Sequence, residues 1–163
     1  MEQSLESRQK VWDLIKNIRV AMLVTRDHDD ALSARPMSAV NTEFEGALWF
    51  MTAGDSPKLE EIASAPDVLV AYAEPKDQHY VSVRGAATIV RDKARINAFW
   101  SEAARVWFPQ GPDKSDIALI RVDVESAEYW DAPSATMVYV YGYAKARLTG
   151  RPPDIGENKT VAF

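Results

Sequence analysis

The chain has 163 residues, of which 47% are hydrophobic and 26% are charged, and this length and composition fit one globular domain. Its net charge of −5 argues against a broad surface for nucleic acid or anionic membranes, and the absence of cysteine excludes disulfides, thiol redox chemistry and thiolate metal sites. The N-terminus is polar, and no apolar run approaches the ~20 residues that cross a bilayer, so we expect a cytoplasmic protein.

The first part of the chain predicts a helix followed by a strand. Apolar residues recur at helical spacing from Ser4 to Asn17, and Arg19–Arg26 reads as a strand that ends in an acidic turn. His28 lies in this turn among three aspartates, but their spacing matches no metal-binding loop. We therefore expect no metal site here.

The stretch Leu32–Ile62 predicts two strands and a helix. The strands are expected to form a hairpin within Ala31–Ala53, joined by a short turn. A tight loop then leads into a helix that begins after Ser56 and ends near Ser64.

Strands are expected in three later segments, which are Asp67–Ala73, His79–Arg91 and Ile117–Trp130, the last as one or two strands. The first is apolar enough for a strand buried on both faces. Gly85, in the middle of the second, indicates a bulge or a sharp bend such as a closed barrel requires.

Two more helices are expected. One begins after a cap at Asp92 and runs to about Trp107. The segment Ser134–Leu148 mixes strand-like and helix-like patterns, and we expect a helix that ends just before Gly150. The tail Arg151–Phe163 is broken by Pro and Gly and is expected to lie on another surface, such as that of a partner subunit.

About six short-connected strands with helices at the start, middle and end predict an antiparallel β-barrel with helical additions. The sequence contains no G-x-G-x-x-G motif and no P-loop, so classical dinucleotide and nucleoside triphosphate sites are not indicated. Its two histidines lack acid–base partners for a Ser-His-Asp or Cys-His set.

Two cations near the ends of Leu32–Ile62 indicate an anion site. Lys58 falls in the first turn of a helix that Ser56 caps and Pro57 opens. At that position the helix dipole disfavours a cation by about 0.3–1 kcal/mol unless an anion is bound. Free backbone N–H groups, the Ser56 hydroxyl and Lys58 together would form a phosphate cradle, and Arg35 lies on the first strand.

The two predicted strands add an apolar wall. Pro36 lacks an N–H for the ladder, so it belongs at an edge, at a bulge or beside something other than a strand. Alternation on the second strand places Trp49, Met51 and Ala53 on one face, and Leu48, Phe50 and Thr52 on the other. These features suit a phosphorylated, flat heterocycle.

The same residues also fit ordinary structural roles. Arg35 could pair with a surface carboxylate, and Pro36 could protect an edge strand from aggregation. Lys58 could pair with Glu61, which lies three residues further along the helix.

Motifs along nearly the whole chain share their order and spacing with a known family. They are R-P-M-S, W-F-M-T, S-P-K-L-x-x-I, W-F-P-Q-G-P-D, E-Y-W-D and the final L-T-G-R-P-P-D-I-G-E-N-K-T-V. In these motifs the chain resembles the general stress protein 26 group of the pyridoxamine 5′-phosphate oxidase-like, FMN-binding split-barrel superfamily. The resemblance implies a mainly β fold, a six-stranded antiparallel split β-barrel with flanking helices, formed by residues 1–163 as one domain.

The resemblance also implies a homodimer that holds FMN at the subunit interface. By position, the phosphate contacts would come from Arg35, Thr52, Ser56 and Lys58. The ring contacts would come from the main chain of Pro36 and Met37 and from the side chains of Trp49, Phe50 and Met51. Trp130, with Trp107 as a further candidate, would approach from the partner chain, although Trp130 also fits a core position at a strand end. A separate indication of a dimer is that the chain has more aromatic side chains than one core needs, such as Trp100, Trp107 and Tyr139.

Three functions stay open at this point. The first is an FMN-dependent oxidoreductase acting on a small molecule, and the second is a flavin-binding stress protein that stores, buffers or senses flavin without turnover. The third is a split barrel that binds another ligand, such as haem or a deazaflavin, or none. The C-terminal signature of true pyridoxamine phosphate oxidases is not found in GRPPDIGENKTVAF, which argues against vitamin B6 oxidase activity. Flavin chemistry resides in the cofactor, so the lack of an acid–base triad does not exclude catalysis.

Overall fold

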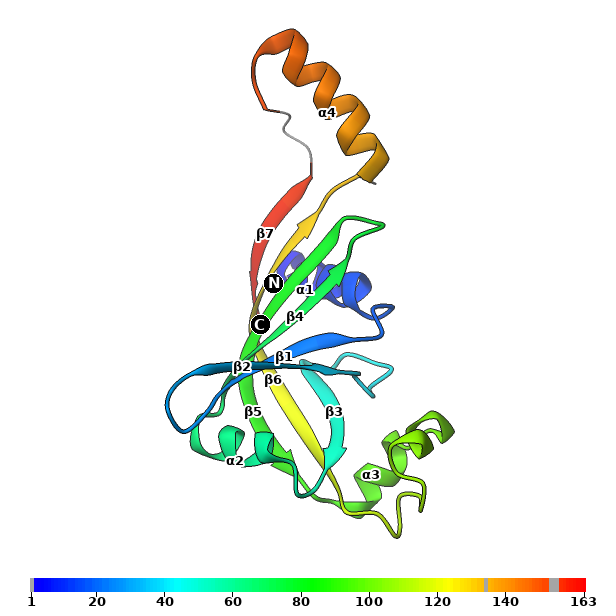
Figure 1. Ribbon diagram of the computed structural model, residues 1–163. Helices are drawn as coiled ribbons and strands as arrows, with labels where there is room; N and C mark the ends of the chain where they lie inside the picture. Colours follow the sequence, from blue (N-terminus) through cyan, green and yellow to red (C-terminus); the bar gives the residue numbers. More distant parts are fainter. Residues whose placement is uncertain (1, 134, 153–155) are drawn as a thin grey trace.

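The computed structural model describes residues 2–133, 135–152 and 156–163, and it is built around one antiparallel sheet of seven strands (Figure 1). Hydrogen-bonded neighbours follow the order β2 (Leu32–Met37), β1 (Ala21–Arg26), β4 (Asp67–Glu74), β5 (His79–Val90), β6 (Ile117–Asp131) and β3 (Ala47–Ala53). The seventh strand, β7 (Glu157–Ala162), pairs with β6. The mainly β, antiparallel prediction is confirmed, with seven strands in place of the expected six.

The two ends of the sheet meet at a single bridge, which curls the sheet into a barrel. Ala39, just beyond β2, pairs with Phe50 of β3, and the Val40 N–H donates to the Trp49 carbonyl at 2.8 Å. Elsewhere β2 pairs with β1 and β3 pairs with β6. The expected hairpin within Ala31–Ala53 is therefore wrong, because its two strands take different partners.

Asn41 explains why the segment between β2 and β3 does not form a hairpin turn. Its side-chain amide donates to the carbonyls of Glu43 and Ala47, and its side-chain oxygen accepts a hydrogen bond from the Trp49 N–H at 3.1 Å. These bonds occupy backbone groups that a hairpin ladder would use, and Pro36 has no N–H to offer. These local side-chain bonds are compatible with the split between β2 and β3.

Burial alternates along the barrel strands. On β4, Val68, Val70 and Tyr72 are buried, whereas Leu69 and Ala71 between them are only partly covered. The expectation that Asp67–Ala73 is buried on both faces is therefore wrong. A strand of a closed sheet sends one face to the barrel interior and the other outward, whatever the polarity of the outward residues.

The interior face of β3 joins the main core, which contains Leu23, Leu48, Phe50, Val70 and Ile120. The outward face of β3 belongs to a second, smaller cluster with Trp49, Ile96 and Leu119. The predicted alternation of faces along β3 is confirmed, and both faces are covered.

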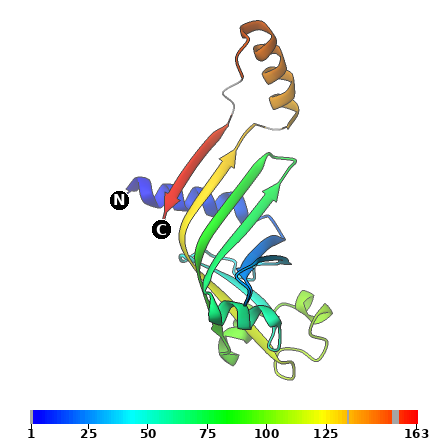
Figure 2. The ribbon, with the colours of Figure 1, turned by 60° about the vertical axis from the view of Figure 1, so that its left-hand side comes forward.

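Four α-helices are described around the sheet, and they are α1 (Glu2–Ile15), α2 (Pro57–Ser64), α3 (Lys93–Phe99) and α4 (Ala135–Thr149). They confirm the helices expected at the start of the chain, after Ser56, after Asp92 and in the C-terminal part. Ser134, where the last helix was expected to begin, lies outside the described residues. α1 packs against β5 and β7, and α2 packs against β1 and β5 (Figures 1 and 2). Within the described part of the chain, no helix is long and apolar enough to cross a membrane.

The expected single helix from Asp92 to Trp107 is wrong in its second half. Asp92 caps α3 as expected, accepting a hydrogen bond from the Ala94 N–H at 3.1 Å. The helix stops at Phe99, Trp100 is extended with ψ 136°, and a 3-10 helix, η1 (Glu102–Val106), follows. Phe99 packs on Trp49, with ring centroids 5.3 Å apart, and Trp100 packs on Phe108. The two neighbouring aromatic side chains thus pack on different partners where the helix ends.

The C-terminal tail was expected to lie on another surface, such as that of a partner subunit. For Glu157–Ala162 this expectation is wrong. These residues form β7 along the last part of β6, so the tail extends the chain's own sheet. Val161 is buried in the main core, and the Phe163 ring meets Phe44 edge-on at 5.5 Å. In the sequence, the apolar residues Val161 and Phe163 at alternate positions could have indicated this strand. The Pro and Gly residues earlier in the tail instead suggested irregular structure.

Gly85 sits at the bend of β5, where the register with β6 shifts between Arg84 and Gly85. The expected bulge is confirmed. A Cβ added at Gly85 would lie 2.2 Å from the carbonyl oxygen of Asp123, which is backbone and cannot rotate away.

We expect Gly85→Ala to lower the free energy of unfolding by about 1–3 kcal/mol, the usual cost of overpacking, and thermal denaturation would measure it. Gly54→Ala is the matched control, because the three atoms nearest to its added Cβ all belong to the exposed side chain of Asp116, which can turn aside. Equal melting temperatures for the Gly85 variant and the wild type would contradict the close approach of β5 and β6.

Candidate ligand-binding site

A cavity of about 800 Å³ opens beside the split between β2 and β3. One wall comes from the end of β2 and the loop after it, Pro36–Asn41, and a second comes from Met51–Ala53 of β3. The last turn of α1 and the region from Phe99 to Phe108 flank these strands, and Lys58 of α2 closes one end. A cavity of this size fits a small organic ligand or cofactor.

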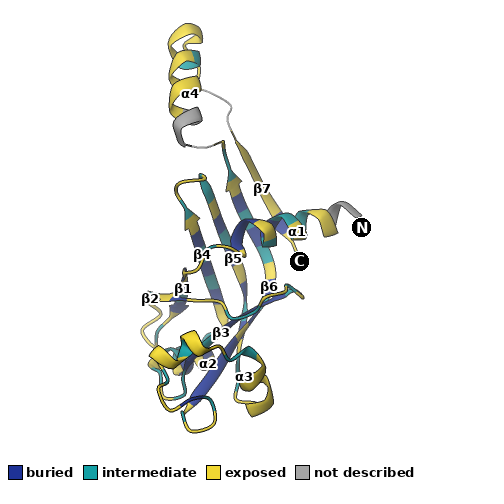
Figure 3. Ribbon diagram, turned by 90° about the vertical axis from the view of Figure 1, so that its right-hand side faces the viewer, coloured by how far each residue is buried: buried dark blue, intermediate teal, exposed yellow. Residues whose placement is uncertain are grey.

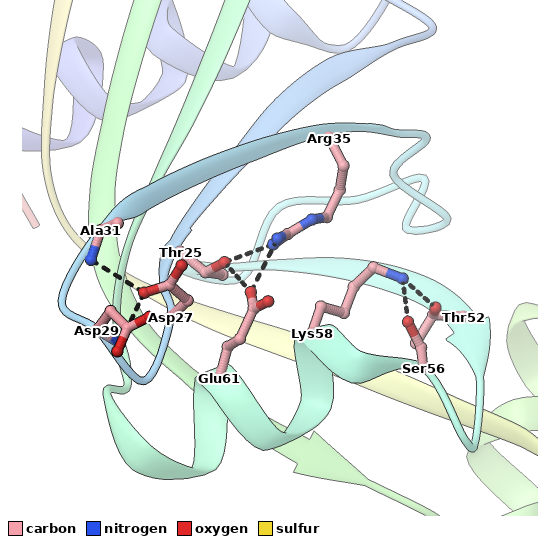
Figure 4. A network of polar contacts seen from close by, with 9 residues as sticks. All are labelled: Thr25, Asp27, Asp29, Ala31, Arg35, Thr52, Ser56, Lys58 and Glu61. Carbon is pink, nitrogen blue, oxygen red and sulfur yellow. Dashed lines mark hydrogen bonds and ion pairs between the residues drawn. The ribbon is translucent and has the colours of Figure 1, made fainter.

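The start of α2 places Lys58 in the wall of this cavity. Pro57 opens the helix and Ser56 has extended, cap-like backbone angles, as predicted, but the Ser56 side chain does not bond the helix N–H groups. Instead its hydroxyl accepts a hydrogen bond from Lys58 Nζ at 2.6 Å, and Thr52 of β3 accepts a second at 2.8 Å (Figure 4). Two hydroxyl groups therefore hold the Lys58 ammonium beside the first turn of a helix.

The electrostatic surroundings of Lys58 favour an anion. Burial and the nearby positive charge of Arg35 lower the pKa of Lys58, and the carboxylate of Glu61 opposes them with a smaller effect. A lowered lysine pKa means that the charged form is disfavoured in the folded protein. The attraction of an anion bound next to Lys58 would oppose both effects and favour the charged form.

Arg35 lies in a separate ion pair next to Lys58 (Figure 4). Its guanidinium donates to a carboxylate oxygen of Glu61 at 2.8 Å and to the hydroxyl of Thr25, which in turn donates to Glu61. The Arg35 and Glu61 side chains are only 19% and 18% exposed. The alternative that Arg35 pairs with a carboxylate agrees with the structure, except that the pair is partly buried and not on the surface. Glu61, named above as an alternative partner for Lys58, forms this ion pair with Arg35.

The structure brings six of the expected contact residues to the cavity, and these are Pro36, Met37, Met51, Thr52, Lys58 and Trp107. Ser56 and Arg35 are not among the lining residues, but Ser56 accepts a hydrogen bond from Lys58 and Arg35 pairs with Glu61. Phe50 is fully buried in the main core, and Trp49 packs against α3 on the opposite face. Trp130 lies in the last part of β6 beside a different hollow, which it lines together with Tyr80 and Gly156.

Tyr72 is a cavity residue that the sequence analysis did not single out. It lies on the buried face of β4, is 4% exposed and lines the cavity. Among the described residues, its hydroxyl is the buried side-chain polar atom without a hydrogen-bond partner. Leaving such a group unpaired costs about 1–3 kcal/mol. Alternation along Asp67–Ala73 could have predicted that Tyr72 lies on the buried face of this strand. A buried tyrosine usually has a hydrogen-bond partner for its hydroxyl, so Tyr72 could then have been considered as a site residue.

The cavity therefore fits a phosphorylated aromatic ligand. Lys58, in the first turn of α2, and Thr52 belong to the lining, which otherwise combines apolar and aromatic side chains with polar ones such as Asn41. These are the groups that a phosphate, a flat ring and a polar ring edge require.

The acidic turn after β1 contains the cluster of His28 and aspartates that the sequence analysis considered as a metal site. Asp27, His28 and Asp29 place their ligand atoms within 4.8 Å of one another, but the Asp27 carboxylate accepts hydrogen bonds from the Asp29 and Ala31 N–H groups (Figure 4). The His28 side chain is 88% exposed. Turn formation accounts for the position of the Asp27 carboxylate.

Comparison with known proteins identifies the fold and the family of this chain. The model of the family called "Pyridoxamine 5′-phosphate oxidase like" matches residues 6–154. A candidate general stress protein 26 from Jannaschia sp. CCS1 is 28% identical, with a TM-score of 0.78, over 98% of this chain and 99% of that one. This match confirms the expected split-barrel fold.

Two further relatives extend the comparison. A general stress FMN/FAD binding protein from Xanthomonas citri is 26% identical, with a TM-score of 0.68, over 78% of this chain and 89% of that one. Protein bli-3 from Neurospora crassa is 25% identical over 94% of this chain and 80% of its own length. The family match over most of the chain and the shared split barrel lead to one conclusion: this chain belongs to the pyridoxamine 5′-phosphate oxidase-like family.

Proposed function

We propose that the protein binds FMN in this cavity and uses it as an oxidoreductase on a small molecule. The observation that carries the proposal is the placement of Lys58, a partly buried cation in the first turn of α2 whose hydrogen-bond partners are the hydroxyls of Thr52 and Ser56. The Xanthomonas citri relative, described as an FMN/FAD binding protein, supports flavin as the ligand.

Each part of the cavity has a role in this proposal. Lys58, Thr52 and Ser56 bind the phosphate, and Arg35 adds a second positive charge from behind. The main chain of Pro36 and Met37 and the side chain of Met51 hold the ring from two strands. Bound flavin supplies the hydride or electron transfer. The protein contributes binding, orientation and the exclusion of water.

The absorbance spectrum of the purified protein tests this proposal first. Flavin bands, or their appearance with quenched fluorescence after FMN is added, support the cofactor. Bleaching by NAD(P)H followed by reoxidation with an added acceptor supports an oxidoreductase. Flavin binding without turnover would favour a storage or sensing role, and failure to bind FMN would favour another ligand.

We also expect a homodimer in which Trp130 approaches the partner's site, whereas Trp107, a further candidate for that role, lines the cavity of its own chain. Trp107 at the cavity rim is 80% exposed, and Tyr139 on α4 is 76% exposed. α4 stands clear of the sheet, and most of its described residues are exposed (Figure 3). Large aromatic side chains are rarely left in water over such areas unless a partner covers them.

Light scattering of the flavin-loaded protein should give about twice the chain mass of 18.2 kDa. Trp107→Ala should shift the mass toward the monomer, whereas Lys76→Ala, on the exposed turn after β4, should not. A monomer at micromolar concentration with flavin bound would contradict the dimer.

A further inference from the structure

The cavity beside the split between β2 and β3 is lined by charges of one sign. Three of its lining residues are cations, which are Lys16, Arg19 and Lys58, and none of the described residues in the lining is an aspartate or a glutamate. The whole chain, by contrast, contains 24 Asp and Glu residues against 19 Lys and Arg residues. A cavity lined by cations alone in an acidic protein favours anionic ligands.

These cations belong to two different parts of the fold. Lys58, in the first turn of α2, donates a hydrogen bond to Thr52 and belongs to the region proposed for the phosphate. Lys16 and Arg19 lie in the connection between α1 and β1. Figures 1 and 2 show α1 and α2 on opposite sides of β1 and β2. The cavity therefore has a second positive region besides the one at Lys58.

Arg19 is the cation of this second region that is open to a ligand. Lys16 is already paired with Asp13, because its Nζ donates to a carboxylate oxygen of Asp13 at 2.6 Å. Arg19 is exposed, and no carboxylate of the described residues forms an ion pair with it. A guanidinium presents two parallel N–H donors that match the two oxygens of a carboxylate.

The lining residues close to Arg19 in the chain are apolar. They are Trp12, Ile15 and Ile18, and each of them is at least partly buried. The Trp12 ring is stacked on Phe44, with ring centroids 5.6 Å apart, so its position is fixed by packing. An acid with a flat, apolar body would place its charge at Arg19 and its body against these side chains.

The two positive regions suit different anions. The region at Lys58 adds the start of a helix and the hydroxyls of Thr52 and Ser56 to its cation, and a phosphate can use all of these donors. Arg19 lies outside the helices and offers one guanidinium, which matches a single negative charge. A carboxylate is therefore the better match for Arg19.

We propose that the substrate of this site is a small carboxylic acid with an apolar body, and that Arg19 binds its carboxylate. The proposal rests on flavin binding in the same cavity and names the class of substrate. The cavity of about 800 Å³ lies in the upper part of the range of ~300–1,000 Å³ found for ligand pockets, which favours occupation by a cofactor together with a small second molecule.

Benzoate and benzamide test the proposal, because they have the same ring and nearly the same size but differ in charge. Both are titrated into FMN-loaded protein at constant ionic strength, and binding is followed by flavin absorbance and by calorimetry. Benzoate should bind at least about 5-fold more tightly than benzamide. Arg19→Gln should weaken benzoate binding about 3-fold to 20-fold, since solvent screens part of the attraction, and leave benzamide binding unchanged. Its FMN affinity should equal that of the wild type.

Arg84→Gln is the matched control, because Arg84 is an exposed arginine of β5 outside the cavity lining, and it should change none of these affinities. If flavin binds but benzoate and benzamide bind equally, or if Arg19→Gln keeps the benzoate affinity, flavin binding stands and the carboxylate site is overturned. Loss of FMN affinity in Arg19→Gln would place the phosphate at Arg19 and also overturn it. Tighter binding of phenyl phosphate than of benzoate would overturn the carboxylate class.

Failure of the proposed function gives a different result. If wild-type protein does not bind FMN, the proposed function fails, and calorimetry with the ligand-free protein then measures the same two affinities. A loss of benzoate affinity in Arg19→Gln but not in Arg84→Gln would still support the carboxylate contact. Equal benzoate affinities in these two variants would overturn it.

Discussion

Lys58→Ala is expected to weaken FMN binding about 10-fold to 200-fold, as measured by fluorescence titration. Charge-assisted hydrogen bonds are worth about 1.5–3 kcal/mol, and ~1.4 kcal/mol corresponds to one decade of affinity. Lys58 lines the cavity and is held by two hydroxyls at a helix start, so a phosphate oxygen is the acceptor that its surroundings favour.

Comparing the affinities of riboflavin and FMN distinguishes the loss of the phosphate contact from other effects of the substitution. It lacks the phosphate, so it should bind the wild-type protein poorly and lose little more in Lys58→Ala. Lys76→Ala, which removes an exposed cation from a distant turn, should leave both affinities unchanged. Unchanged FMN affinity in the Lys58 variant would contradict the phosphate-site assignment.

The ligand-free stability of Lys58→Ala has a predictable sign. Because the folded protein lowers the pKa of Lys58, the folded state binds this proton less readily than the unfolded chain does. The resulting penalty is fully present below the folded pKa, and it disappears as the pH rises through that pKa toward the ordinary value of 10.5. At neutral pH the variant should therefore melt at the wild-type temperature or above it, while the stabilisation by FMN shrinks.

Arg35 should also contribute to FMN affinity, but its substitution has a second consequence. Arg35→Ala leaves the partly buried Glu61 carboxylate without its guanidinium partner, so we expect lower ligand-free stability as well as weaker binding. The double variant Arg35→Ala/Glu61→Gln removes this unpaired charge. If it recovers stability but not FMN affinity, the contribution of Arg35 to binding is distinguished from its structural role.

Phe50→Ala is expected to cause the largest loss of stability, about 3–5 kcal/mol, which chemical denaturation would measure. Phe50 is fully buried and faces the barrel interior from the strand that closes the barrel against Ala39. Leu48 shares this face and is equally buried, so Leu48→Ala should lose about 2–5 kcal/mol.

These two variants, together with Trp49→Ala, test the prediction that Trp49 and Phe50 line the flavin ring. The cavity lining reaches Met51 and Thr52 but neither Trp49 nor Phe50, so we expect their effects on the flavin spectrum to be indirect. Phe50→Ala and Leu48→Ala should then perturb the spectrum alike. A flavin shift in the Phe50 variant that is absent from the Leu48 variant would restore Phe50 to the ring wall.

The sequence by itself determined the local features of this protein. Ser56, Pro57 and Lys58 predicted where α2 begins and which cation stands there, because capping preferences and the fixed φ of proline act within one turn. Asp92 predicted the start of α3, and Gly85 predicted the bulge in β5 for similarly local reasons. The antiparallel barrel followed from the number and spacing of strands.

Only the tertiary structure decided which segments meet. The partners of β2 and β3, the addition of β7 to β6 and the pairing of Arg35 with Glu61 depend on residues far apart in the chain. Tyr72 of β4 and Met37 of β2 line one cavity although β1 lies between their strands. Strand propensity and alternation fix which face a residue takes but not its neighbour, since register is set by packing across the whole barrel.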